Sequence, residues 1–414
     1  MKILHINTAQ QGGAALCARR IHEALVKAGE DSKMLFAEGS ELPEGIDGAI
    51  AKKDECLWVK IPILRSIIWR LIHYLPFLMN AEKLQEQVNE ANTSHLYLHT
   101  PLSQYKNIAE HPLVKWADVI HLHWVSGFID YPTFFKKVRK PIVWTLHDKH
   151  PAVGLQHYSS VFFPIPDKLK SLDDFCKKIK RESLVKAENL NIVAISKMME
   201  GICQNSDVLR GFPITLIHNG IDGNSFKLYN KKEYRKELGL LPDASIFLFS
   251  SYNIHDPNKG LCRLIEALDK MDVPNKMLVC IGMSFEPIQE ASFPIILTGL
   301  LTSYTRLSKY YSAADYFISN SYEETFGQTL LESLACGTPV ITTPCSGSHD
   351  LINQENGVVC SDFTVEALVE GIKLAMSRTY IPERIREDVI NRFSYDKIAK
   401  QYLDLYFRVL GEKQ

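Results

Sequence analysis

Short apolar runs alternate with longer amphipathic segments along most of this chain. The runs are rich in β-branched residues and end in glycine or polar residues, as strands of a parallel sheet covered on both faces do. The runs are Lys2–Thr8, Ala117–Trp124, Pro141–His147, Asn191–Ser196, Ser245–Ser251, Met277–Gly282, Ile295–Gly299, Tyr316–Ser319 and Val340–Thr343. This alternation predicts an α/β protein built from doubly wound parallel sheets.

Helical spacing is clear in five of the amphipathic segments, and the segment Gln328–Cys336 has well-marked ends. It starts directly after Gly327, and Gly337 with Pro339 stops it. The other four segments are Ala14–Ala28, Leu261–Leu268, Leu307–Ala314 and Phe393–Leu410. The loop, helix, break and strand between residues 322 and 343 form the stretch where we expect a binding site.

A helix that starts just after a glycine presents unpaired backbone N–H groups and a positive dipole end, which suits a phosphate. Glu324 precedes this helix, and Glu332 lies roughly 7–8 Å along its axis at about 1.5 Å per residue. Carboxylates accept hydrogen bonds from sugar hydroxyls well. The stretch therefore predicts a nucleotide-sugar site, with sugar hydroxyls at Glu324, diphosphate at Thr325–Thr329 and the ribose diol at Glu332. Two solvated glutamates on a surface helix are the alternative for this spacing taken alone.

Length and composition narrow the class of protein. The chain has 414 residues, which is enough for two domains of ordinary size. A net charge of −1 gives no strong field for nucleic acid. The nine cysteines are odd in number and contain no C-x-x-C pair, which argues against both a disulfide framework and a zinc site.

The chain shows no targeting or spanning segment of the usual kinds. Its start, MKILHINTAQ, leads straight into a predicted strand without a positive n-region or a cleavage site, so we expect no signal peptide. It has no run of 18 or more uncharged apolar residues, so we expect no membrane-spanning helix. These features favour a cytoplasmic location.

The segment Trp58–Met79 is apolar and aromatic, and it carries basic residues. It could lie in a membrane interface at the inner face of the membrane, with its basic side chains toward the headgroups. A helical hairpin packed on the sheet is the favoured alternative, because Pro62 and Pro76 interrupt the amphipathic pattern.

Two further features lie at the ends of the first predicted strands. Gly12 and Gly13 follow the first strand, where adjacent glycines either let the backbone approach a ligand or serve only a tight turn. The G-x-G-x-x-G fingerprint is absent there, which counts against a dehydrogenase. His121, His123 and His147-Asp148 lie near strand ends where α/β sheets bind ligands, but their spacing matches no zinc motif, so we predict no metal site.

The motifs together resemble those of one enzyme family. The spacing of Glu324 and Glu332, with Phe-Gly in the loop and Gly-Thr-Pro-Val after the helix, resembles the Glu-x7-Glu motif of retaining GT-B glycosyltransferases of family 4. The text ADVIHLHW…KPIVWTLHD resembles a capsule- and exopolysaccharide-type branch of that family. LIHNGIDGNSF resembles its hinge, and Lys259-Gly260 resembles its Lys-Gly turn.

The resemblance implies a GT-B fold of two facing doubly wound Rossmann-like domains. It places an acceptor-side domain at residues 1–222, with a helical insertion at about 50–112, and a nucleotide-sugar-binding domain at 223–392. It also implies that residues 393–414 form a C-terminal helix that crosses back onto the first domain.

The resemblance also implies an activity. This is the retaining transfer of a sugar, of hexosyltransferase type, from a UDP-sugar or GDP-sugar to a hydroxyl of a glycan or lipid-linked acceptor in cell-surface polysaccharide synthesis. The enzyme would need no cofactor and no metal, and would contact the membrane only peripherally. The carried-over catalytic roles are donor-sugar contact at His147, diphosphate neutralisation at Lys259 and sugar positioning at Glu324. The donor-binding residues are Gly12, Gly13, Phe326, Gly327, Gln328, Thr329 and Glu332.

The chain departs from the family pattern in two loops. Residues 149–158 differ from the usual Met-Trp-Pro-Phe-Thr-Gly-Gly-Cys-His-Tyr, and Asn253, His255 and Asn258 stand where an arginine is common. These departures leave open an alternative function, a non-catalytic sugar-nucleotide-binding subunit of a polysaccharide assembly complex.

Overall fold

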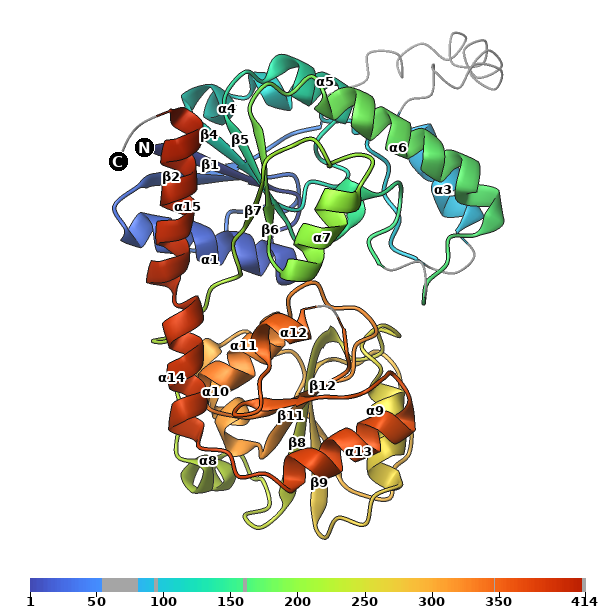
Figure 1. Ribbon diagram of the computed structural model, residues 1–414, viewed down its shortest axis with the longest axis vertical. Helices are drawn as coiled ribbons and strands as arrows, with labels where there is room; N and C mark the ends of the chain where they lie inside the picture. The colour runs from blue at the N-terminus through green and yellow to red at the C-terminus, as the bar shows by residue number, and fades with distance from the viewer. Residues whose placement is uncertain (54–80, 93–95, 159–161, 346, 412–414) are drawn as a thin grey trace. The chain divides into compact units, whose positions relative to one another are not determined.

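The computed structural model describes residues 1–53, 81–92, 96–158, 162–345 and 347–411 (Figure 1). The segment Trp58–Met79, with its two alternative interpretations, lies outside these residues. The chain divides into two compact units. Unit 1 comprises residues 1–195, 199–217 and 401–414, and unit 2 comprises 196–198 and 218–400.

Unit 1 is built on a parallel sheet of seven strands in the order β3-β2-β1-β4-β5-β6-β7. The strands are β1 (Lys2–Asn7), β2 (Asp31–Phe36), β3 (Gly48–Ile50), β4 (Val119–Leu122), β5 (Ile142–Leu146), β6 (Leu190–Ala194) and β7 (Ile214–Leu216). Every residue of β4 and β5 is buried, because helices cover both faces of the sheet (Figure 1).

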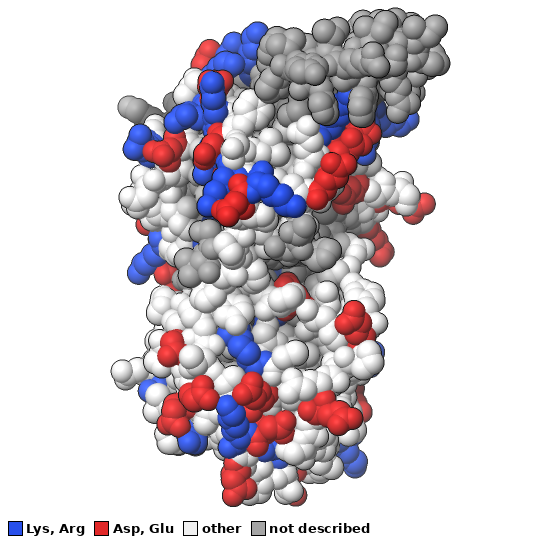
Figure 2. All heavy atoms as spheres, turned by 90° about the vertical axis from the view of Figure 1, so that its right-hand side faces the viewer, with Lys and Arg blue, Asp and Glu red and all other residues white. Residues whose placement is uncertain are grey.

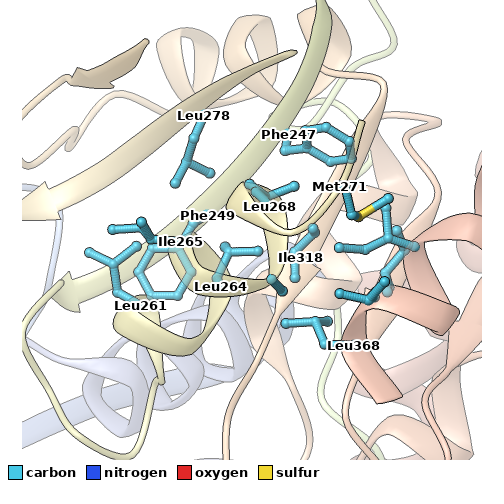
Figure 3. Packing of buried hydrophobic residues seen from close by; sticks show 14 of the residues in the cluster. Phe247, Phe249, Leu261, Leu264, Ile265, Leu268, Met271, Leu278, Ile318 and Leu368 are labelled. Atoms are coloured by element: carbon cyan, nitrogen blue, oxygen red, sulfur yellow. The ribbon is translucent and has the colours of Figure 1, made fainter. Parts of the chain in front are cut away.

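Unit 2 contains a parallel sheet of six strands in the order β10-β9-β8-β11-β12-β13. The strands are β8 (Ser245–Asn253), β9 (Lys276–Met283), β10 (Ile295–Leu297), β11 (Tyr316–Ser319), β12 (Val340–Thr342) and β13 (Gly357–Val359). Figure 3 shows the apolar core on one face of this sheet, where Phe247, Phe249 and Ile318 meet Leu264 and Leu268.

Helices connect the strands of both sheets. In chain order they are α1 (Gly13–Lys27), α3 (Ala81–Ala91), α4 (Pro112–Trp116), α5 (Tyr131–Lys137), α6 (Lys170–Leu184), α7 (Lys197–Asn205), α8 (Lys231–Glu237), α9 (Leu261–Asp269), α10 (Tyr304–Ala313), α11 (Gln328–Ala335), α12 (Ser348–Leu351), α13 (Val365–Met376), α14 (Pro382–Phe393) and α15 (Tyr395–Leu410). Short 3-10 turns lie at Ile108–Glu110, His150–Ala152 and Asp167–Leu169. Within the described residues, none of these helices has both the length and the apolar character needed to cross a membrane.

The fold confirms the prediction of two doubly wound parallel sheets, and each predicted strand coincides with a strand. The prediction of one helix over Phe393–Leu410 is wrong in its first residues. Phe393 ends α14, and Ser394 adopts an extended backbone between α14 and α15. The reason is a parallel bridge to Ile221, whose N–H donates to the Phe393 carbonyl and whose carbonyl accepts from Tyr395.

The second half of α15 groups with unit 1. The Tyr402 hydroxyl lies 2.9 Å from Thr145 Oγ1, and the Tyr406 hydroxyl lies 2.7 Å from His121 Nδ1. All four side chains are buried. These contacts cover the face of the sheet from which the histidines of β1 and β4 project.

Basic and acidic side chains are interspersed on the face of the molecule in Figure 2. This mixture agrees with the net charge of −1 and with pairs such as Lys177–Asp173 on α6, whose Nζ and Oδ2 are 2.7 Å apart.

Candidate functional site

The N-terminus of α11 has the geometry that the sequence predicts for it. Gly327 is the N-cap and has a φ of 94°, a left-handed conformation that favours glycine. This cap has no side chain, so it makes no side-chain hydrogen bond to the first turn. Gln328 and Thr329 are the first two residues of the helix and are half-buried. The end of α11 therefore presents backbone N–H groups and the positive end of the helix dipole.

Lys259 and Glu324 come together beside this loop. Lys259 lies between β8 and α9, and its Nζ is 2.6 Å from Glu324 Oε2. About a quarter of each side chain is exposed, so the ion pair remains open to solvent. Burial alone would lower the pKa of Lys259, but the Glu324 carboxylate outweighs this effect and holds the pKa above its usual value.

Asn258 joins the two loops that carry this pair. Its side chain donates to the Glu323 carbonyl and accepts from the Glu323 N–H, both at 2.9 Å. The Asn258 carbonyl also accepts from the N–H of Tyr322. Gly260 follows with a φ of 69°, and a Cβ there would lie 2.6 Å from the Asn320 carbonyl oxygen. The loops are therefore held at a separation that only glycine at position 260 allows.

Glu332 and Phe326 are buried. Glu332 Oε2 accepts a hydrogen bond from the Tyr311 hydroxyl at 3.1 Å. Burial, and next the Glu332 carboxylate, raise the pKa of Tyr311 well above its usual value. The Phe326 ring is 2% exposed and packs within 6 Å of the His218 and Phe393 rings. The Phe326 ring therefore stabilises the loop by packing. Only the backbone of Phe326 is left for the predicted contact with the donor.

In unit 1, Gly12 and Gly13 form the turn between β1 and α1. Gly12 is the N-cap of α1 with a φ of 95°. No atom would lie within 4 Å of a Cβ at either glycine, so the space beside this turn is open. Only Gly12 requires glycine for its backbone conformation.

His147 follows β5 and is the end of a row of three imidazoles. Its Nε2 lies 3.0 Å from His123 Nδ1, and His123 Nε2 lies 2.9 Å from His5 Nδ1. Burial lowers the pKa of His147 to about 4 and holds those of His5 and His123 well below the usual value. The row is therefore neutral at pH 7, and its hydrogen bonds fix the orientation of the His147 ring.

Nitrogen atoms of His5, His121 and His123 all lie within 4.8 Å of one another, a grouping that could hold a metal ion. His121 already uses both nitrogens, since Nε2 lies 2.7 Å from Thr145 Oγ1 and Nδ1 lies 2.7 Å from the Tyr406 hydroxyl. A metal would have to displace these hydrogen bonds. Our prediction of no metal site stays a prediction.

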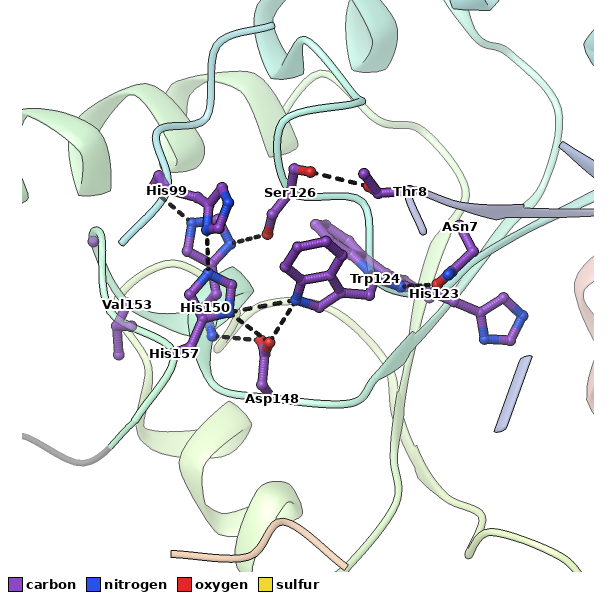
Figure 4. Close-up of polar contacts among 12 residues, drawn as sticks. Asn7, Thr8, His99, His123, Trp124, Ser126, Asp148, His150, Val153 and His157 are labelled. Atoms are coloured by element: carbon purple, nitrogen blue, oxygen red, sulfur yellow. Dashed lines mark hydrogen bonds and ion pairs between the residues drawn. The ribbon is translucent and has the colours of Figure 1, made fainter. Parts of the chain in front are cut away.

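A second polar cluster in unit 1 surrounds Asp148 (Figure 4). Asp148 Oδ2 accepts from Trp124 Nε1 at 2.8 Å and from His157 Nδ1 at 2.6 Å, and Oδ1 accepts from the His150 N–H at 2.9 Å. His157 Nε2 lies 2.9 Å from His99 Nδ1. Burial would raise the pKa of Asp148, but His157 and these hydrogen bonds lower it below its usual value.

Lys180 holds the segment that follows this cluster. Its Nζ donates to the carbonyls of His150, Val153 and Gly154, and the side chain is fully buried. Burial lowers the pKa of Lys180 to about 7. Residues 150–154 are therefore fixed from within, in the loop where the sequence departs from the family pattern.

The cluster around Asp148 and the role of Lys180 were not predicted from the sequence. His99 and His157 stand alone in the sequence, with no spacing that relates them to each other or to Asp148. The only signal was the position of Asp148 at a strand end.

The fold and the sites described above define a class of protein, and comparison with solved structures agrees with it. The structure resembles sucrose-phosphate synthase from Thermosynechococcus elongatus with a TM-score of 0.69, at 20% identity, over 99% of each chain. It resembles HepE of Anabaena, solved in complex with UDP-glucose, with a TM-score of 0.65, at 16% identity, over 98% of this chain and 99% of the other. The chain therefore has the GT-B fold of glycosyltransferases.

Residues 230–392, most of unit 2, match the family model described as Glycosyl transferases group 1. The chain thus carries a group 1 glycosyltransferase domain. It is 26% identical over 310 residues to an uncharacterized glycosyltransferase of Methanocaldococcus jannaschii, covering 70% of this chain and 75% of that relative. It is 26% identical over 242 residues to the capsular polysaccharide biosynthesis glycosyltransferase CapM of Staphylococcus aureus, covering 54% of this chain and 63% of that relative. These matches support a transferase.

Proposed function

We propose that this protein is a retaining glycosyltransferase. It moves a sugar, which we expect to be a hexose, from a nucleoside diphosphate sugar to a hydroxyl of a glycan or lipid-linked acceptor in cell-surface polysaccharide synthesis. The observation that carries the proposal is the ion pair of Lys259 and Glu324 beside the glycine-capped start of α11. One cation, one carboxylate and one helix N-terminus suit the diphosphate and the sugar of such a donor.

Departure of the diphosphate concentrates negative charge on its oxygens. Lys259 Nζ and the N–H groups at the start of α11 stabilise this charge, because they are already oriented before the reaction. The diphosphate replaces Glu324 as the partner of Lys259. The Glu324 carboxylate then accepts hydrogen bonds from sugar hydroxyls and positions the anomeric carbon, which is orientation rather than covalent catalysis.

The remaining predicted residues take supporting roles. The Glu332 carboxylate accepts hydrogen bonds from the ribose diol. The Tyr311 hydroxyl already orients this carboxylate. His147 contacts the donor sugar through a ring whose orientation His123 fixes. The turn at Gly12 and Gly13 leaves open space for a ligand. No step of this mechanism calls on a metal or a cofactor.

Relatives support the class of donor and the process. HepE was solved with UDP-glucose, and CapM acts in capsular polysaccharide biosynthesis. For this protein we propose a UDP-sugar or a GDP-sugar as donor. We also propose that it works on the cytoplasmic side of the membrane, with peripheral contact to the lipid-linked acceptor.

Calorimetric titration with UDP, GDP, ADP and their sugars tests the donor site. One nucleotide should bind the wild type and the Lys309→Ala variant, but bind Lys259→Ala at least about tenfold more weakly, because a charge-assisted contact to phosphate is lost. Lys309 is a matched control, since its Nζ pairs with Glu237 at 2.7 Å and its side chain is about as buried as that of Lys259. Binding of no nucleotide by the wild type would overturn the proposal.

One observation favours a second candidate, a non-catalytic sugar-nucleotide-binding subunit. Arg263 is close to Lys259 in sequence, but its guanidinium donates to the carbonyls of Phe363 and Asn320 and stacks 3.6 Å from the Tyr322 ring. Asn258 is likewise used within the loops. Release of nucleoside diphosphate from the donor separates the two candidates, because a binding subunit releases none. In a binding subunit, a Glu324→Ala substitution would change only the affinity for the donor.

A further inference from the structure

We propose that His218 positions the loop at residues 324–327, which we name the Glu324 loop, to bind the diphosphate of the donor. His218 does not itself contact the donor in this scheme. It acts through Phe326, the residue that precedes the N-cap of α11. This inference rests on the proposed function, because it names a further residue on which the same diphosphate site depends.

Three aromatic rings from distant parts of the chain pack against one another within unit 2. The centroid of the His218 ring lies 5.6 Å from that of Phe326 and 5.4 Å from that of Phe393. The rings of Phe326 and Phe393 are 5.9 Å apart. These distances are typical of favourable aromatic pairs. Both phenylalanine rings are buried and His218 is half-buried, so each ring is held in place by the other two.

The position of the Phe326 ring determines the geometry at the start of α11. Phe326 is followed by Gly327, the N-cap, which has a φ of 94° and a ψ of 64°. Glycine restricts its own backbone very little, so the conformation at this position depends on the residues around it. A displaced Phe326 ring would therefore rotate the cap. The first N–H groups of α11 would then turn away from a bound diphosphate.

A hydrogen bond to Asp350 fixes the orientation of His218. Its Nε2 lies 3.3 Å from Oδ2 of Asp350, in α12, and this oxygen also accepts from the Lys197 N–H at 2.7 Å. Burial would raise the pKa of Asp350, but the hydrogen bonds from His218 and Lys197 hold it below its usual value. An ionised carboxylate only accepts hydrogen bonds, so the Nε2 atom of His218 carries a proton.

The residue before α12, Gly347, contacts the Glu324 loop directly. The Gly347 N–H donates to the Glu324 carbonyl at 2.9 Å. A Cβ at Gly347 would lie 2.4 Å from the backbone carbonyl carbon of Phe326, so the two segments are in close backbone contact. His218 is therefore connected to the Glu324 loop by two routes. One route is the Phe326 ring, and the other passes through Asp350 and Gly347.

Arg392 joins the ring of Phe393 to the backbone of Asp350. Its guanidinium lies 4.6 Å from the centroid of the Phe393 ring, a distance at which an aromatic face attracts a cation. The same guanidinium donates to the Asp350 carbonyl. The rings and α12 are thus held together on the side of α14 as well. His218 contacts both, because its ring packs on Phe393 and its Nε2 donates to Asp350.

The test is calorimetric titration of the full-length protein with the nucleoside diphosphate that the wild type binds. His218→Ala removes both contacts of the ring and should weaken binding by about tenfold. His218→Phe keeps the ring packing and His218→Gln keeps a donor for Asp350, so each should weaken binding by only about threefold. His349→Ala is the matched control and should bind like the wild type, because His349 is an exposed histidine next to Asp350 on α12.

His218 is a positioning residue in this scheme, so two readouts separate its role from a general effect on folding. His218→Ala should weaken binding of the nucleoside diphosphate but not of the same nucleoside without phosphates, measured by NMR titration, because the start of α11 holds the phosphates. Phe326→Leu should weaken diphosphate binding by itself. Adding His218→Ala to it should lower the affinity by less than about twofold more, since residues that act through one contact are not additive.

The outcomes separate this inference from the proposed function. If the wild type binds no nucleotide, the proposed function fails and the inference fails with it. If the wild type and His218→Ala bind the nucleoside diphosphate equally well, only the role of His218 is overturned. Equal losses for the nucleoside and its diphosphate, or a further tenfold loss in the double variant, overturn it too. If His218→Ala does not fold, wild-type affinity in both His218→Phe and His218→Gln gives the same negative result.

Discussion

The donor loops of unit 2 and the polar cluster around Asp148 in unit 1 differ in how clearly the sequence indicates them. Glu324 and Glu332 are on one loop and the helix after it, and Asn258 joins this loop to that of Lys259. The cluster around Asp148 takes His99 from one loop and His157 from another, 58 residues later, and Asp148 from the end of β5. A site on one helix end is visible as a sequence motif, whereas a site assembled by a sheet edge becomes visible only in the fold.

The two regions also differ in exposure. Lys259 and Glu324 are each about one quarter exposed, and their pairing must change when a ligand binds. In unit 1, Lys180 and His150 are buried, and the polar atoms of both side chains are hydrogen-bonded. We therefore expect substitution of Lys259 to affect activity, and substitution of Lys180 to affect stability.

The largest effect should come from Lys259→Ala. We expect kcat for donor turnover to fall on the order of 100- to 1000-fold, because a preoriented charge at the leaving group is lost. The free energy of unfolding should change by less than about 1 kcal/mol, since a partly exposed ion pair contributes little. Steady-state kinetics and urea unfolding, with Lys309→Ala as control, measure both. A large loss of stability in Lys259→Ala would remove the contrast between the two regions.

Lys180→Met should have the next largest effect, on stability. The substitution keeps most of the side-chain volume but leaves the three carbonyls that Lys180 binds without their donor, at a cost of about 2–4 kcal/mol. Urea unfolding measures this cost against Lys178→Met, an exposed position on the same helix. Equal stabilities of the two variants would show that the carbonyls find other donors.

Stability should also depend on pH through the buried histidines. Burial lowers the pKa values of His22, His99 and His147 to about 4, whereas in the unfolded chain they are about 6.5. Between these values the unfolded state binds more protons, so stability is fully present above pH 6.5 and falls as the pH drops toward 4. Unfolding by urea at pH 7.5 and 5.0 should show a loss of a few kcal/mol.

A His22→Gln variant gives the control for this pH effect. Glutamine can keep a hydrogen bond to Ser32, which His22 Nδ1 meets at 2.8 Å, but it cannot be protonated. The variant should lose less stability than the wild type between pH 7.5 and 5.0. A loss as large as that of the wild type would mean that His22 does not contribute to the dependence.

The smallest predicted effect separates steric contact from backbone strain in the donor loops. Gly260→Ala should cost about 2 kcal/mol or more, because its φ is 69° and its Cβ would lie 2.6 Å from the Asn320 carbonyl oxygen. Gly239→Ala has a similar φ of 67° with no atom within 4 Å, so strain alone should cost about 1 kcal/mol. Thermal unfolding of both variants gives the difference between the two losses of stability. Equal losses would mean that the loops carrying Gly260 and Asn320 can move apart to make room for the methyl group.

The sequence predicted the strands well because each central strand is a buried run of apolar residues bounded by polar ones. It predicted the start of α11 because the positive φ of Gly327 and the stop at Gly337 have local chemical causes. It was wrong at Ser394, where a bridge to Ile221, far away in the chain, interrupts the helical pattern.

The partners of single polar residues could not be predicted in the same way. The sequence does not indicate that Lys180 faces three backbone carbonyls, since an isolated lysine on an amphipathic helix usually faces solvent. Nor does it relate His99 to His157, whose contact depends on how two loops fold over the edge of the sheet. These contacts follow from tertiary packing, which one sequence encodes without a local signature.

The order of the elements along the chain has a consequence for synthesis on the ribosome. Thr145 and His121 of unit 1 obtain their buried partners from Tyr402 and Tyr406. These tyrosines are translated after residues 218–400, which make up nearly all of unit 2. Unit 1, although it is synthesised first, therefore reaches its final packing only after unit 2 has been synthesised. A fragment that stops at residue 217 would carry an unfinished sheet face.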